Sequence, residues 1–200
     1  MLISNTRVLN VPIFSLQTGT AIALTNTAII DPENLQIVAF FVAGPLVNKS
    51  NENILLASSI RDFSKLGIVI DAIDELVAQD DVIKIKKILA LNFDLMNLKV
   101  VAKNGVKLGK VTGYNLTTSG LFVQQLIVKR PFTKSFLDPE LTISREDIIE
   151  ITDTKIIVKN EHEKKKLLSE QEIKQAFNRE KSNQFATIVR DDIEKTTAAE

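Results

Sequence analysis

Short apolar runs rich in Ile, Val, Phe and Thr, each bounded by turn-forming residues, dominate the first part of the chain. β-Branched and aromatic residues favour strands, and the Gly, Pro, Asn and Asp residues between the runs supply turn conformations. Runs this short and this closely spaced predict a small β-barrel or sandwich instead of strands that alternate with helices. The predicted strands are residues 8–14, 22–25, 28–30, 37–42, 54–56 and 68–70.

The second part of the chain repeats this pattern at a constant offset of 86 positions. Agreement over many apolar positions favours a duplication over chance similarity between two β-rich stretches, so we predict two β domains in tandem. The offset relates Gly19 to Gly105, Ile22 to Leu108, Leu35 to Leu121 and Ile37 to Val123.

Residues 72–91 lie between the two β-rich stretches and differ from both. Their apolar positions recur at roughly helical spacing with lysines between them, which fits either a linking helix or a further strand. Beyond residue 160, a charge run and the capping box Ser169-Glu170-Gln171-Glu172 predict a short helix from Glu170 to about Lys181. The predicted organisation is a first domain over 1–76, a linker over 77–91, a second domain over 92–160 and a charged helical tail over 161–200.

The second stretch opens with a glycine-bounded turn and strand, Gly105-Val106-Lys107-Leu108-Gly109-Lys110-Val111. Apolar segments follow at 121–128, 147–151 and 156–158. This order resembles the PRC-barrel family, whose small β-barrel forms the cytoplasmic part of the photosynthetic reaction-centre H subunit and the C-terminal domain of the ribosome-maturation factor RimM. The first stretch departs from the pattern at Ala23, which replaces the second glycine.

The resemblance covers roughly residues 5–160. It implies two tandem small β-barrels and leaves the C-terminal segment unexplained. Together with the tail predicted above, the predicted fold is mainly β, with two tandem small β-barrels followed by a helical tail. Members of the family serve mostly as docking or assembly modules and share no set of catalytic residues, so the resemblance transfers no site residue to this chain.

The composition excludes several kinds of chemistry. The 200 residues include no Cys, which rules out disulfides, thiolate metal sites and cysteine nucleophiles, and one His, which rules out a multi-histidine metal site. His162 lies in a charge run and fits a surface position. Two acid–Pro–acid segments, at 31–33 and 138–140, could pair carboxylates for glycosidase or cation chemistry, but such segments favour turns. We therefore predict no enzyme, no cofactor, no metal and no small-molecule substrate.

Charge is distributed unevenly along a chain in which Lys+Arg 25 balance Asp+Glu 25. Residues 1–76 carry four basic and seven acidic side chains, whereas residues 91–160 carry ten basic and seven acidic ones. A basic domain attracts RNA, an acidic protein or an anionic lipid surface. RNA is disfavoured because Tyr114 and Phe122 make a poor platform for base stacking and the chain has no Trp. The predicted basic partner-binding surface is Lys107, Lys110, Lys129, Arg130 and Lys134.

These features favour a non-catalytic protein-interaction or assembly module, because barrels this small leave little room for an internal ligand and partners then dock outside. The expected partner is an unidentified protein. The alternative is a ribosome- or RNA-associated maturation factor similar to RimM. No basic leader precedes an apolar run and no apolar window approaches the roughly 20 residues of a membrane-spanning helix, so we expect a cytoplasmic protein, with peripheral membrane association left open.

Overall fold

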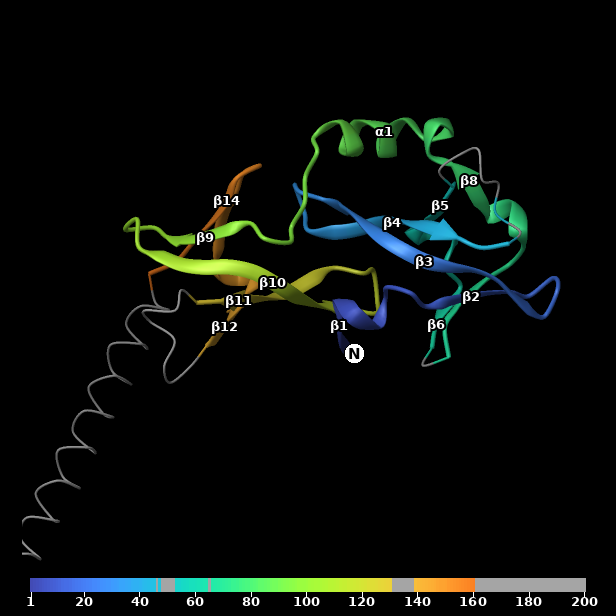
Figure 1. Ribbon diagram of the computed structural model, residues 1–200, viewed down its shortest axis with the longest axis horizontal. Coiled ribbons are helices and arrows are strands. Elements are labelled where there is room, and N and C mark those ends of the chain that lie inside the picture. The colour runs from blue at the N-terminus through green and yellow to red at the C-terminus, as the bar shows by residue number, and fades with distance from the viewer. Residues whose placement is uncertain (46, 48–52, 65, 131–138, 161–200) are drawn as a thin grey trace, which may run out of the picture. The chain divides into compact units, whose positions relative to one another are not determined.

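The computed structural model describes residues 1–45, 47, 53–64, 66–130 and 139–160 (Figure 1). In these residues the chain is mainly β-structure, which confirms the predicted fold class at that level. Met1–Lys159 form one compact unit. The predicted tail helix, residues 170–181, lies outside the described residues.

The first sheet has its described strands in the order β6-β7-β2-β3-β4-β5-β8. Neighbouring strands are antiparallel except β2 and β7, which are parallel. The predicted strands 22–25 and 28–30 are halves of the single strand β3, whose pairing shifts register between Thr25 and Ala28. The bounds are β2 Pro12–Ser15, β3 Thr20–Asp31, β4 Gln36–Ala43, β5 Asn53–Leu56, β6 Asp62–Phe63, β7 Ile68–Ile70 and β8 Leu76–Ala78.

The second sheet repeats this strand order. Its path β13-β14-β9-β10-β11-β12 corresponds strand for strand to β6-β7-β2-β3-β4-β5, and β14 and β9 are again the parallel pair. The N-terminal strand β1 joins this second sheet by pairing with β10. The bounds are β1 Leu2–Ser4, β9 Lys99–Ala102, β10 Lys107–Thr117, β11 Val123–Lys129, β12 Glu140–Ser144, β13 Ile148–Ile151 and β14 Lys155–Val158.

Both sheets are open in the part of the chain that the structure describes. No strand ladder there joins β6 to β8, or β12 to β13, which would be needed to close either sheet into a ring. Short 3₁₀ turns connect several strands: Asn5–Arg7, Ala57–Ser59, Ile73–Glu75, Gln79–Asp81 and Arg145–Asp147.

The segment between the sheets contains both a strand and a helix, the two alternatives that its apolar spacing left open. It supplies the edge strand β8 and then the helix α1, Ile83–Ala90. Ile85 and Ile88 of α1 are buried against the first sheet, while the lysines between them are exposed. The helix thus covers one face of the first sheet, where Figure 1 draws it beside β3 and β4.

The two sheets meet through their equivalent turns, β3–β4 and β10–β11. The Ile37 amide donates to the Leu121 carbonyl at 3.0 Å, and the Val123 amide donates to the Leu35 carbonyl at 2.9 Å. Because each partner is 86 positions from its equivalent, the two hydrogen bonds are reciprocal across the repeat. Leu35 and Leu121 both have positive φ, 51° and 53°.

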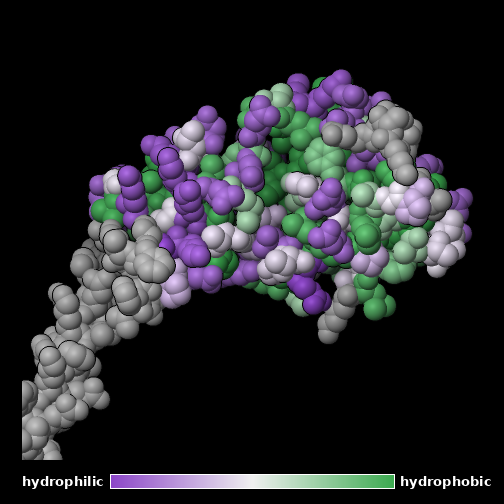
Figure 2. Space-filling model, viewed as in Figure 1, coloured by the Kyte–Doolittle hydropathy of each residue, from purple (hydrophilic) through white to green (hydrophobic). Residues whose placement is uncertain are grey.

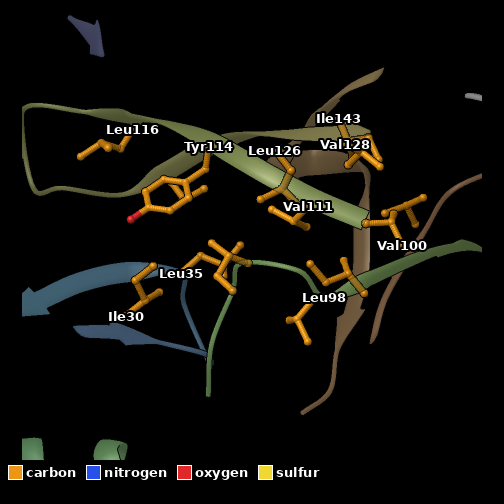
Figure 3. Packing of buried hydrophobic residues seen from close by; sticks show 14 of the residues in the cluster. Ile30, Leu35, Leu98, Val100, Val111, Tyr114, Leu116, Leu126, Val128 and Ile143 are labelled. Atoms are coloured by element: carbon orange, nitrogen blue, oxygen red, sulfur yellow. The ribbon is translucent and has the colours of Figure 1, made fainter. Parts of the chain in front are cut away.

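A shared core supports this junction. Ile30 and Leu35 of the first repeat belong to the same buried cluster as Tyr114 and Leu116 of the second. Figure 3 shows the Tyr114 ring pointing from β10 toward the segment that carries Ile30 and Leu35. The core therefore continues from one sheet into the other and holds the second sheet, with its outer surface, in place.

Candidate anion-binding surface

Four lysines stand in register across four neighbouring strands of the second sheet. Lys155 of β14 pairs with Lys99 of β9, Lys99 with Lys110 of β10, and Lys110 with Lys129 of β11. Residues that are directly opposite in a ladder project from the same face of the sheet. We call Lys155, Lys99, Lys110 and Lys129 the lysine row.

The alternation of buried and exposed side chains along each strand places the lysine row on the outer face of the sheet. Side chains alternate between the two faces of a sheet, so the neighbour of an exposed lysine points inward. All four lysines are exposed, and the adjacent Ile156, Val100, Val111 and Val128 have 0% exposure. The backbone position of each lysine is therefore fixed by a fully buried neighbouring residue.

The row places like charges close together without a compensating ion pair. Neighbouring strands lie about 4.8 Å apart, and like charges directly opposite each other destabilise a sheet. The ion pairs of the described residues involve other side chains, such as Lys159 with Asp147 at 3.7 Å. The acid next in register is Glu140, opposite Lys129 on β12, and its carboxylate forms no ion pair with Lys129.

A cavity of about 500 Å³ lies beside three members of the row. Val101 and Gly109 give it an apolar floor, and lysines surround it. Hydrophilic side chains, purple in Figure 2, cover much of the region where Figure 1 places β9 and β10. The described residues that line it are Asn97, Lys99, Val100, Val101, Lys107, Gly109, Lys110, Thr112, Lys129 and Arg130.

Gly109 shapes the strand that carries the row. A Cβ at this position would collide with the carbonyl oxygen of Lys129, so only glycine lets β10 approach β11 this closely. Pairing with β9 shifts register between Lys107 and Gly109. Lys107 and Lys110, three residues apart, would face opposite sides of a regular strand, but the shift leaves both exposed.

The structure brings most of the predicted basic surface together. Lys107, Lys110, Lys129 and Arg130 line the one cavity, and Lys134 lies outside the described residues. The predicted set lacks Lys99 and Lys155, whose place in the row depends on the parallel pairing of β9 with β14. A signal for them exists in the sequence, because each lysine directly precedes a three-residue apolar run.

The equivalent positions of the first sheet carry no charge. There the register pairs Pro12 of β2 with Leu24 of β3, and Leu24 with Ala43 of β4. These strands occupy the same places in the shared order as β9, β10 and β11. The fold accepts uncharged residues along this line, so it does not itself require the lysines.

Asp31, the acidic candidate at the start of the segment 31–33, makes local contacts that stabilise a turn. Asp31 is 6% exposed, its Oδ1 accepts from the Glu33 amide at 3.0 Å, and its Oδ2 lies 3.9 Å from the Lys84 Nζ. The turn expected at 31–33 is present, whereas Asp138 and His162 lie outside the described residues. Across the described ranges, no three His, Cys, Asp or Glu side chains gather closely enough to hold a metal ion.

No family model and no curated protein matches this chain. Among the described helices, none has the length and apolar character to cross a bilayer. Function is therefore inferred from the geometry of the lysine row.

Proposed function

We propose that this chain is a non-catalytic interaction or assembly module of two PRC-barrel-like domains, which docks an anionic macromolecular partner on the lysine row. The repeated strand order of the two sheets supports the tandem arrangement of this proposal. The first sheet, through α1 and the shared core, acts as the rigid support on which the second sheet presents its outer face.

The observation that carries the proposal is the uncompensated lysine row itself. Each opposed like-charge pair destabilises the free protein by about 0.2–1 kcal/mol, and the row contains three such pairs. The equivalent line of the first sheet shows that uncharged residues fit this fold. A destabilising arrangement that the fold does not need is typical of a functional surface, where a bound anion removes the repulsion.

The cavity chemistry supports binding over catalysis. Its described lining combines lysines, an arginine, Asn97 and Thr112 with apolar residues, and among these described residues there is no carboxylate or imidazole that could transfer protons as a paired acid and base. The alternative, an RNA- or ribosome-associated factor, shares the need for positive charge. A protein partner takes precedence because none of the described residues that line the cavity is an aromatic that could stack on a base.

The test measures binding of the full chain to two anionic polymers, poly-glutamate and poly-uridine, as salt is raised. The triple variant Lys99→Gln, Lys110→Gln and Lys129→Gln should lose most of the binding to whichever polymer the wild type prefers. The control variant Lys86→Gln, Lys87→Gln and Lys103→Gln has the same change in charge at exposed lysines outside the row. Equal losses in the two triple variants would show that only net charge matters, and the proposal would fail.

A further inference from the structure

The distance between successive lysines of the row is close to the rise of an α-helix per turn. Four strands at about 4.8 Å spacing set the outer lysines about 14 Å apart. An α-helix rises 5.4 Å per turn, so acids at positions i, i+4, i+7 and i+11 form a stripe of about 16 Å. Each turn can then face one lysine, and the flexible four-carbon stems of lysine accommodate the difference of about 2 Å.

An extended peptide fits the row less well. Its same-face side chains repeat every 6.6–6.8 Å or so, which places about three acids along a distance that holds four lysines. A single-stranded nucleic acid binds such surfaces by combining phosphate contacts with base stacking, and the part of the cavity lining that the structure describes includes no aromatic side chain.

From this match we infer that the partner segment is an acidic α-helix that lies across the strands β14, β9, β10 and β11, an inference that rests on the proposed function. The cavity beside the row indicates a further property of the partner helix. Its floor at Val101 and Gly109 lies beside the row, so an apolar side chain that flanks the acidic stripe is buried there. The partner helix is thus amphipathic, with acids one turn apart and an apolar residue next to them.

The experiment uses the full chain and three fluorescent probes at about 0.1 M salt, where the screening length is about 10 Å. The first probe is an alanine-rich peptide of about 16 residues with Glu at i, i+4, i+7 and i+11 and one flanking Leu. The second has the same composition with its Glu residues spread around the helix. The third is a poly-uridine oligonucleotide of about 12 nucleotides.

The striped peptide should bind about tenfold more tightly than the scrambled one, and binding should order it as a helix by circular dichroism. Lys99→Gln, Lys110→Gln and Lys129→Gln should each weaken its binding about two- to fivefold, as expected for exposed ion pairs. Lys103→Gln, an exposed lysine outside the row, should change the affinity less than twofold. Double-mutant cycles with single Glu→Gln peptides should couple each lysine to one turn of the helix.

The contrary outcomes separate this inference from the function on which it rests. Equal affinity for the striped and scrambled peptides overturns the helical partner. Oligonucleotide binding that depends on the row, without peptide binding, also overturns it but leaves an anion-docking module. If none of the three probes binds, both the helical partner and the proposed function are wrong.

Discussion

Removing the central lysine of the row should make the protein more stable. Lys110 is opposed by Lys99 on one side and by Lys129 on the other, so Lys110→Gln deletes two like-charge pairs. At about 0.2–1 kcal/mol per pair, the free energy of unfolding should rise by about 0.4–2 kcal/mol. For a chain of this size that corresponds to a melting temperature about 1–8 °C higher.

Lys107→Gln is the matched control for this measurement. Lys107 is an exposed lysine on the same strand, but its register partner on β9 is Val101. The two substitutions share their change in charge, side-chain length and strand environment, so the difference between the two variants isolates the opposed lysines. Thermal and urea unfolding of both variants should be followed at about 0.02, 0.1 and 1 M salt.

The salt series decides whether electrostatics is the cause. The screening length falls to about 3 Å at 1 M salt, shorter than the distance between strands, so the advantage of Lys110→Gln over Lys107→Gln should disappear there. A Lys110→Gln variant no more stable than Lys107→Gln at low salt would refute the claim that the row is repulsive. An advantage that persists at 1 M would point to packing instead of charge.

Three further predictions concern the core and the strands that position the row. Gly109→Ala should lower the free energy of unfolding by about 1–3 kcal/mol in a urea titration, because its Cβ would collide with the Lys129 carbonyl; an unchanged urea midpoint would contradict this. Leu121→Ala should cost about 2–5 kcal/mol, since Leu121 is 4% exposed at the junction of the sheets, and a neutral effect in the same titration would count against that packing. Burial, assisted by the charge of Asp94, raises the pKa of Tyr114 from 10.0 to about 12. The stability from keeping this phenol neutral is complete below pH 10 and is lost as pH rises from 10 to 12, by about 2–3 kcal/mol in total. Urea midpoints of wild type and Tyr114→Phe should therefore diverge over that range, and parallel curves would refute the effect.

The apolar runs predicted strands well where a strand was regular and less well where the backbone bends. Val8 lies within a predicted strand and is fully buried, yet β2 begins at Pro12. The Val8 carbonyl accepts from the Thr25 hydroxyl at 2.8 Å, so a side chain satisfies the backbone there instead of a strand partner. An apolar run predicts burial, but it does not predict which group will hydrogen-bond to the buried backbone.

The candidate site was predictable only in part, for a related reason. Lys107, Lys110, Lys129 and Arg130 could be predicted because they cluster along the sequence. The apolar run after Lys155 predicts its strand but not its place in the row, which depends on a parallel pairing between strands 56 positions apart in sequence, Lys99 to Lys155. Register between distant strands depends on tertiary packing, and local patterning does not encode it.

The two reciprocal hydrogen bonds, Ile37 to Leu121 and Val123 to Leu35, have the form of an isologous interface, in which the same patch contacts itself. A one-repeat ancestor of this chain would have made the same contact as a homodimer, with two identical outer faces that had to change together. Within one polypeptide that constraint is absent. The two outer lines accordingly differ: one carries Pro12, Leu24 and Ala43, and the other carries the lysines that, in the proposed function, bind an anionic partner.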